Sequence, residues 1–293
     1  MARNAGKLAA ARPFQIGHWQ SAMGKAAAFT MIEIAICLAI IGFALVAIIG
    51  VLPLGMNTQR DVREETVINQ DATVLLDLIR SGARNADYVT NYVYAVTNYW
   101  THYDSNGVAL KTSNDGFTYN NASFDGVAND YYRLTNGVNI IGRLSVPEFS
   151  DGNGNALSYN PIPYSFGVDC YSNHVVAYVR AMSGLASDRP PQDNALLIGD
   201  SFAYRLYCVN APMAVDTNTF VAPTIPASRS SFATQLAANQ RDLRLTFLWP
   251  QLPNGNYGNG RQTFRATVAG QLVRLNNNLD TVYFYQPQFT NAP

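Results

Sequence analysis

A long uncharged stretch early in the chain restricts the folds that it can adopt. No Asp, Glu, Lys or Arg occurs from Ile34 to Gln59, and Ile34–Leu54 consists almost wholly of Ile, Leu, Val, Ala and Gly. About 20 apolar residues are enough for a helix to cross the hydrocarbon core of a bilayer. A single carboxylate, Glu33, stands at the start of this run. An unpaired charge at membrane depth costs about 2.5–3.5 kcal/mol on insertion scales, so we expect Glu33 to have a partner.

The residues ahead of this run, 1–28, carry only positive charge. Their charged residues are Arg3, Lys7, Arg12 and Lys25. Positive charge before a first apolar segment keeps that end in the cytoplasm, so the bulk of the chain is expected on the other side of the membrane. Because residues 1–28 have no apolar core of their own, an ordinary secretory signal would have to use the run Ile34–Leu54. A plain signal anchor, or an exported protein that begins near Asn57, therefore remains an alternative.

The sequence Phe29-Thr30-Met31-Ile32-Glu33, followed by Ile-Ala-Ile-Cys-Leu-Ala-Ile-Ile-Gly, resembles the class III signal of type IV pilins and type II secretion pseudopilins. The resemblance implies that a prepilin peptidase cuts between Ala28 and Phe29 and methylates the new amino terminus of Phe29. It also implies that Glu33 pairs with the methylated amine of a neighbouring subunit. The chain departs from the family pattern in one respect, because Ala28 stands where Gly is usual and Gly24 lies further upstream.

The resemblance further implies a non-enzymatic structural subunit of a helical filament in a type II secretion or type IV pilus-like machine. Its partners would be prepilin peptidase, other pilins or pseudopilins, an inner-membrane assembly platform and membrane lipid. The chain would be a single-pass protein of the bacterial inner membrane with a periplasmic C-terminal domain. From Phe29 it has 265 residues, which is large for a major subunit, so a minor pseudopilin or minor pilin is expected.

Two other functions fit the same sequence. One is a signal-anchored periplasmic domain that binds a ligand or a glycan without polymerising. The other is a major adhesive pilus subunit, which predicts abundant surface fibres that contain this chain.

Residues 29–84 are expected to form one spine helix whose first half is transmembrane. Pro53 lies near the end of the apolar run, where a missing N–H kinks or loosens a helix. A membrane helix followed by an unrelated amphipathic helix is the alternative. Beyond Gly55 the apolar residues recur at helical spacing, namely Ile68, Ala72, Leu75, Leu76, Ile79 and Ala83. The acidic residues are expected largely on other faces, namely Asp61, Glu64, Glu65, Asp71 and Asp77.

Residues 85–293 are expected to form a β-rich globular domain. Alternating apolar residues and dense turn signals predict a mostly antiparallel sheet packed on the second half of the spine helix, which makes the fold class α+β and pilin-like. Strands are expected over Val175–Arg180, Phe202–Cys208, Leu243–Trp249, Phe264–Val273 and around Val282 and Phe284. Turn dipeptides are Asn106-Gly107, Asp115-Gly116, Asp125-Gly126, Asn136-Gly137, Asp151-Gly152, Asn254-Gly255 and Asn259-Gly260.

A Tyr- and Asn-rich segment, 85–139, is expected to be an insertion in this domain. Its tyrosines either form a contact surface for a glycan or a protein, or pack on the sheet within loops and hairpins. They include Tyr88, Tyr92, Tyr94, Tyr99, Tyr103, Tyr119, Tyr131 and Tyr132.

Three cysteines occur. Cys37 lies in the apolar run and is expected to be a small packing residue. Cys170 and Cys208 lie in or beside expected strands, so they are candidates for a disulfide in an oxidising periplasm.

No metal, cofactor or catalytic site is predicted. The segment Asp151-Gly-Asn-Gly-Asn resembles the start of a calcium loop, but Ala156 and Ile162 replace its sixth and twelfth residues, so a polar turn is expected. All four charges of residues 1–28 are basic, which leaves 16 Lys and Arg against 20 Asp and Glu from Phe29 onward. This slightly acidic balance gives no electrostatic basis for binding nucleic acid.

Overall fold

The computed structural model describes residues 29–118, 131–134, 136–161, 169–183, 202–213, 235–252, 255–277 and 280–286. The chain divides into two units, residues 1–58 and residues 59–293. Helix α1, Met31–Arg80, contributes residues to both units, and we describe each unit by itself.

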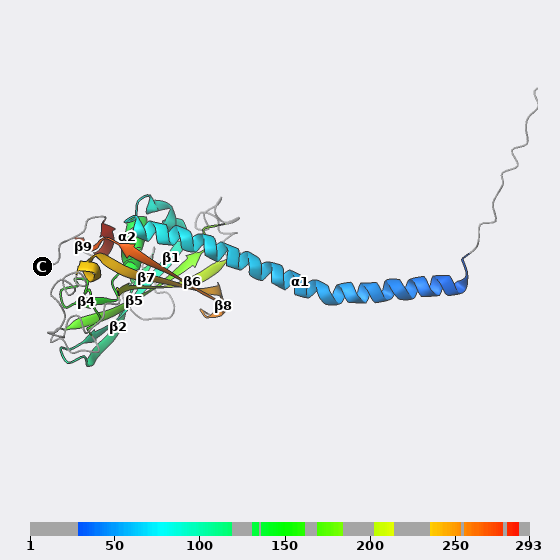
Figure 1. Ribbon diagram of the computed structural model, residues 1–293, viewed down its shortest axis with the longest axis horizontal. Helices are drawn as coiled ribbons and strands as arrows, with labels where there is room; N and C mark the ends of the chain where they lie inside the picture. Colours follow the sequence, from blue (N-terminus) through cyan, green and yellow to red (C-terminus); the bar gives the residue numbers. More distant parts are fainter. Residues whose placement is uncertain are drawn as a thin grey trace, which may run out of the picture. The chain divides into compact units, whose positions relative to one another are not determined.

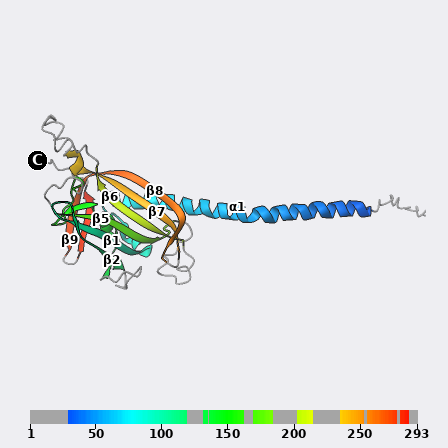
Figure 2. The same ribbon diagram turned by 90° about the horizontal axis from the view of Figure 1, so that it is seen from below.

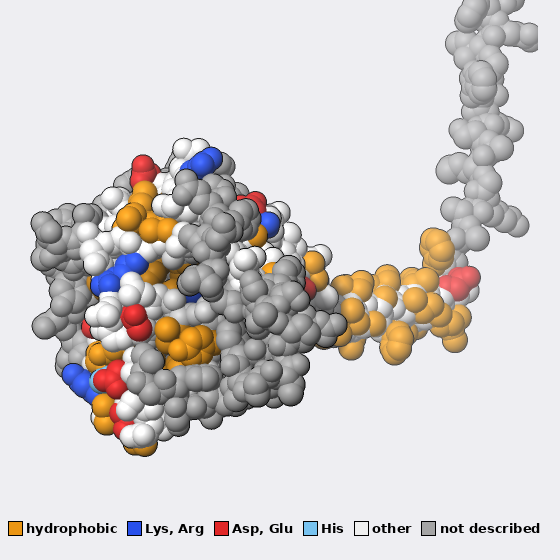
Figure 3. All heavy atoms as spheres, turned by 60° about the vertical axis from the view of Figure 1, so that its left-hand side comes forward, with side chains coloured by type: hydrophobic (Ala, Val, Ile, Leu, Met, Phe, Trp, Pro, Cys, Tyr) orange, Lys and Arg blue, Asp and Glu red, His pale blue; other side chains and the backbone are white. Residues whose placement is uncertain are grey.

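The first unit is an apolar helix without a packing partner in the described part of the chain. Every residue from Phe29 to Thr58 is exposed, including Phe43, which is 80% exposed. Figure 3 shows hydrophobic side chains covering the visible side of this helix, with acidic atoms only near its start. The helix is long and apolar enough to cross a membrane. The long apolar helix predicted from the sequence is therefore confirmed.

The second unit is built on one large sheet. Its strands are β1 (Val93–Tyr103), β2 (Ala109–Thr118), β3 (Tyr131–Arg133), β4 (Phe149–Asp151), β5 (Cys170–Arg180), β6 (Ala203–Pro212), β7 (Gln240–Gln251) and β8 (Tyr257–Ala269). The strand order is β3-β2-β1-β5-β6-β7-β8, and β4 pairs with β5. Every pair of strands in this sheet is antiparallel except β2–β3, which is parallel. Figure 2 shows the strands side by side in a twisted sheet.

Helical segments and a small hairpin accompany this sheet in the described part of the chain, and residues 235–239 form a further short helical turn before β7. The other segments are the C-terminal part of α1, the 3-10 helix η1 (Ala86–Asn91), α2 (Gly137–Leu144) and the antiparallel pair β9 (Gln271–Asn277) and β10 (Asp280–Gln286). The C-terminal part of α1 lies over one face of the sheet (Figure 1). This arrangement is an α+β layer fold, and the predicted antiparallel sheet is confirmed.

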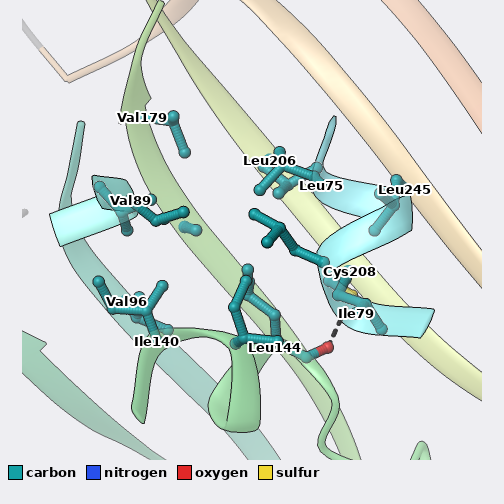
Figure 4. Close-up of a cluster of buried hydrophobic side chains, with 14 of the residues drawn as sticks. Leu75, Ile79, Val89, Val96, Ile140, Leu144, Val179, Leu206, Cys208 and Leu245 are labelled. Carbon is teal, nitrogen blue, oxygen red and sulfur yellow. Dashed lines mark hydrogen bonds between the residues drawn. The ribbon is translucent and has the colours of Figure 1, made fainter. Parts of the chain in front are cut away.

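The hydrophobic core lies between the helices and the face of the large sheet that α1 covers. Figure 4 shows the side chains of the core pointing toward one another from α1, η1, α2 and the strands. They include Leu75, Ile79, Val89, Val96, Ile140, Leu144, Val179, Leu206, Cys208 and Leu245. The α1 residues of this core recur every three or four positions, which is the spacing of one helix face.

Two glycines let the backbone of α2 approach its neighbours closely. A Cβ at Gly137 would lie 1.8 Å from the carbonyl oxygen of Ala86, the first residue of η1. A Cβ at Gly142 would lie 2.7 Å from side-chain atoms of both Val282 and Phe284 on β10. Helix α2 is therefore held between the backbone of η1 and the side chains of β10.

Alternation of apolar residues predicted the strands correctly, but several turn dipeptides were misread. Asn136-Gly137 begins α2, because the Asn136 side chain accepts a hydrogen bond from the backbone N–H of Asn139 and caps the helix. Asp115-Gly116 and Asn259-Gly260 lie inside β2 and β8. The strand predicted over Phe264–Val273 is two strands, which meet at Gly270, whose φ is 125°. Asn106-Gly107 is confirmed as part of the turn between β1 and β2.

The described part of segment 85–139 is not an insertion. It supplies β1 and β2, and β1 lies within the main sheet between β2 and β5. Tyr92 is buried in the core, and the ring of Tyr94 packs against that of Tyr178 on the opposite face of the sheet. Tyr119 and the turn Asp125-Gly126 lie outside the described residues.

We expect Leu75→Ala to lower the free energy of unfolding of the second unit by about 2–5 kcal/mol. Leu75 is fully buried in the core, so the substitution removes transfer free energy and leaves a cavity. Urea unfolding of the full chain in detergent, followed by near-UV circular dichroism, measures the change. Gln70→Ala on the exposed side of α1 is the control, with an expected change within about 0.5 kcal/mol.

Candidate functional site

Helix α1 begins with a reciprocal pair of side chains, Thr30 and Glu33. The Oε2 atom of Glu33 accepts hydrogen bonds from the backbone N–H of Thr30 at 2.8 Å and from its hydroxyl at 2.9 Å. The Thr30 hydroxyl oxygen in turn accepts from the backbone N–H of Glu33 at 3.3 Å. This is a capping box, in which the N-cap residue just before the helix and the residue three positions later satisfy each other's backbone donors.

The capping box uses only one of the two carboxylate oxygens. Within the part of the chain that the structure describes, Oε1 of Glu33 accepts no hydrogen bond. Phe29, one residue before the box, is 80% exposed. Ala28 lies outside the described residues, so the geometry of the predicted scissile bond is not described.

The role of Thr30 was missed in the sequence, although a signal for it was present. Thr-x-x-Glu just before an apolar run is the sequence pattern of a capping box. The family resemblance implies roles for Phe29 and Glu33 but none for Thr30.

Pro53 lies inside α1, which continues through it as one helix. Because proline has no N–H, the carbonyl of Ile49 lacks its usual partner four residues later. A kink at Pro53 stays a prediction.

A second notable group, Asp71, lies at the contact between α1 and the sheet. Its carboxylate is fully buried and accepts three hydrogen bonds. The backbone N–H of Met182 donates to Oδ2 at 3.0 Å, the hydroxyl of Tyr204 donates to Oδ2 at 3.0 Å, and the hydroxyl of Ser183 donates to Oδ1 at 2.5 Å. These donors come from the end of β5 and from β6, so Asp71 joins the helix to two sheet segments.

Burial raises the pKa of Asp71 above its ordinary value of 3.8. The hydrogen bonds from Ser183, Met182 and Tyr204 favour the charged form and oppose this shift. The sequence analysis placed Asp71 away from the apolar face, and that prediction was wrong. Asp71 stands three residues after Ile68 and four before Leu75, so helical spacing alone already placed it on the buried stripe.

The disulfide considered between Cys170 and Cys208 is not formed, and both thiols are free. Cys208 pairs across the sheet with Val175, five residues along β5 from Cys170. Five residues of strand span about 16 Å and place the two side chains on opposite faces of the sheet. Disulfides require Cα atoms about 4.4–6.8 Å apart, so the register excludes this bond. The Cys208 thiol donates instead to the carbonyl oxygen of Leu144, at 2.9 Å.

The carboxylate of Asp151 organises a turn. Its Oδ1 accepts from the backbone N–H groups of Asn153 at 2.9 Å and Asn155 at 2.7 Å, and its Oδ2 accepts from the Asn155 side chain at 2.9 Å. These contacts make the segment a polar turn of the Asx type. Among the described residues, no cluster of three or more His, Cys, Asp or Glu side chains has a geometry suited to a metal ion.

Comparison of the chain with known protein families, curated proteins and solved structures finds no match. The structure itself shows an exposed apolar helix and an α+β unit.

We expect the stability contribution of Asp71 to depend on pH. Its folded-state pKa is raised, so the folded protein binds this proton more tightly, and the contribution is fully present below the unfolded pKa. It is lost as pH rises from about 3.9 through the raised value. Asp71→Asn does not titrate, and its amide can donate to Ser183 while its oxygen accepts from Met182 and Tyr204. The stability of the Asn variant relative to wild type should therefore rise with pH in this window.

Urea unfolding of the full chain at a series of pH values measures this difference. Asp71→Ala is the companion variant, because it leaves the Met182 N–H and the Tyr204 hydroxyl without their acceptor. Each lost acceptor costs about 1–3 kcal/mol at any pH. A difference between Asp71→Asn and wild type that stays constant across the window would contradict the raised pKa.

Proposed function

We propose that this chain is a minor pseudopilin or minor type IV pilin, a structural subunit of a helical filament in a type II secretion or type IV pilus-like machine. The observation that carries the proposal is the beginning of α1. Glu33 is the only charged residue from Phe29 to Gln59, and it stands four residues after Phe29 at the start of an exposed apolar helix. An ionisable group in such a place is a functional-site candidate by default.

The capping box supports different roles for the two carboxylate oxygens of Glu33. Oε2 satisfies the donors of Thr30, so the carboxylate is oriented by its own helix. Oε1 is left to accept a hydrogen bond from the methylated amine of Phe29 on a neighbouring subunit. Cleavage between Ala28 and Phe29 leaves the Phe29–Thr30 amide intact, so the N–H of Thr30 stays available for the box.

Pairing of Glu33 with a neighbour's amino terminus would be a head-to-tail contact. A contact of this kind uses two different surfaces and builds an open helix when the rotation does not close. The exposed helix 31–58 supplies the apolar surface for such packing, and membrane lipid covers it before assembly. The remaining partners under this proposal are prepilin peptidase, the inner-membrane assembly platform and other pilins or pseudopilins.

The proposed location is the bacterial inner membrane, with residues 59–293 on the periplasmic side and the chain entering a periplasmic or surface filament. A structural rather than catalytic role is part of the proposal. The large outer unit favours a minor subunit, because a bulky domain is harder to repeat along a tightly packed fibre.

We expect the membrane-extracted protein to begin at N-methylated Phe29 when prepilin peptidase is present. Mass spectrometry and N-terminal sequencing of the full-length product, made with and without that peptidase, provide the measurement. Replacing Phe29 is unsuitable as a control, because it alters the new terminus, so Ala28→Gly is used. It restores the usual family residue before the cut and should leave the start site at Phe29. A chain that keeps residues 1–28 in both strains would favour a simple signal anchor, and a start near Asn57 would indicate an exported soluble protein.

We expect both Glu33→Ala and Glu33→Gln to reduce incorporation into filaments by at least about tenfold. Either change leaves the neighbour's amine unpaired among apolar side chains, where an uncompensated charge costs about 2.5–3.5 kcal/mol. Incorporation is measured by cross-linking and by recovery of the filament fraction, with membrane insertion measured in parallel. The Gln variant keeps an oxygen that can accept from Thr30, so it separates charge pairing from capping. Normal assembly of Glu33→Gln would show that only the cap matters and would refute the electrostatic pairing.

A further inference from the structure

A polar cleft opens in the second unit. It has a volume of about 280 Å³ and lies between one end of the sheet, helix α2 and strand β10. Its polar lining includes Asn98 of β1, Asp115 of β2, Asn173 of β5, Arg143 of α2 and Thr281 of β10. The volume is at the lower end of the range for small-molecule sites, about 300–1,000 Å³.

Charges of both signs line the cleft, and the nearby ammonium of Lys111, 5.5 Å from the centre of the Trp100 ring, also attracts Asp115. Asp115 and Arg143 are its lining carboxylate and guanidinium, and they attract each other. The guanidinium of Arg143 is buried and lies 3.1 Å from the centre of the Phe117 ring, so it is fixed by the core. A phosphate would meet the carboxylate of Asp115, and a cation would meet Arg143. A neutral ligand avoids both repulsions.

The carboxamides in the cleft are held in fixed orientations. Asn173 donates to the carbonyl oxygen of Pro147 at 3.2 Å and to the hydroxyl oxygen of Ser150 at 3.3 Å, and it accepts from the amide nitrogen of Asn98 at 3.3 Å. The Oδ1 atom of Asn98 is buried and has no hydrogen-bond donor in the described part of the chain. A buried oxygen without a donor is uncommon in folded proteins and calls for a bound hydroxyl or water.

An aromatic surface continues outward from the cleft on the same face of the sheet. Asn98, Trp100 and His102 alternate along β1 and so share one face. Tyr171 of β5 pairs with His102 and stacks on it with ring centres 4.6 Å apart, and it contacts Trp100 edge-on at 5.7 Å. The indole N–H of Trp100 donates to Asp115 at 3.0 Å, which joins the aromatic surface directly to the cleft.

We propose that this cleft binds a neutral saccharide. The carboxylate of Asp115 offers a planar pair of acceptor oxygens that matches the vicinal hydroxyl groups of a sugar ring, and the Asn98–Asn173 pair forms a rigid polar wall beside it. Trp100 and Tyr171 offer the C–H surface of the next sugar unit the part of their rings that the Lys111 ammonium, 5.5 Å from the centre of the Trp100 ring, and the stacked His102 ring leave uncovered. The limited volume fits one sugar unit inside the cleft, with the rest of a chain lying along Trp100 and Tyr171.

The inference goes beyond the proposed filament function and does not depend on it. Every residue that carries it belongs to residues 59–293, whereas the filament proposal rests on Phe29, Thr30 and Glu33. Loss of filament assembly and loss of saccharide binding can therefore be observed separately.

The test uses the full chain in micelles of a detergent without a sugar headgroup, because a maltoside would compete for the cleft. Saturation-transfer difference NMR is recorded with glucose, galactose, mannose, N-acetylglucosamine, maltose, cellobiose and chitobiose as probes. We expect saturable transfer to at least one of these sugars, and no competition by inorganic phosphate or glycine. Trp100→Ala and Asp115→Asn should each weaken binding by about tenfold or more.

Tyr257→Ala is the matched control, because Tyr257 is an aromatic residue that lines a separate groove with Tyr207 and Leu248. It should leave the affinity unchanged, and circular dichroism should show that all three variants stay folded. The proposal is overturned if no probe binds, if phosphate or glycine displaces the sugar, or if Tyr257→Ala weakens binding while Trp100→Ala and Asp115→Asn do not.

Discussion

The contact between one stripe of α1 and one face of the sheet determines the arrangement of the second unit. The apolar residues of this stripe, such as Leu75 and Ile79, can slide along an apolar surface at little cost, because hydrophobic attraction has no direction. Hydrogen bonds do have direction. The carboxylate of Asp71 accepts from Met182 and Tyr204 only when the helix stands at one height along the sheet. Apolar burial thus supplies the attraction, and Asp71 selects the register.

The same helix contains two kinds of apolar surface that residue type does not distinguish. Ile68 and Ile79 are fully buried, whereas Ile40 and Ile48 are more than half exposed. The difference is that no described segment packs on residues 31–58. Such a surface is stable in water only when another apolar phase covers it. Lipid and the helices of neighbouring subunits are the two phases that the proposed function offers. When this helix moves from lipid into contact with neighbouring helices, Glu33 would then be the one group whose charge requires a partner.

The parts of the fold that depend on local pattern were predictable, and those that depend on distant partners were not. Apolar residues stand at every second position from Tyr204 to Cys208 of β6 and from Leu243 to Trp249 of β7, so this periodicity identified both strands. Asn136-Gly137 misled, because the same dipeptide suits a hairpin turn and a helix cap, and only the following helix decides between them. Helical spacing places Asp71 on the buried stripe, but the donors that make burial of its carboxylate tolerable are more than 100 residues away in sequence and could not be predicted. Thr30 was predictable in principle, since its partner lies three residues away. The polar cleft was not, because its lining comes from separate helices and strands that only the topology brings together.

The close approach of α2 to its neighbours has a consequence for the width of the cleft. Helix α2 contributes Arg143 to the lining of the cleft, and its position is fixed by main-chain contact at Gly137 and by close packing of Gly142 against the buried side chains of Val282 and Phe284. Because neither glycine has a side chain that could rotate to accommodate a shift, the distance between α2 and the sheet behaves as a fixed dimension of the fold. A site with fixed walls loses little conformational entropy when it is filled, and it discriminates by size more sharply than a site that can relax. Gly137 and Gly142 therefore limit the size of a ligand that can enter the cleft.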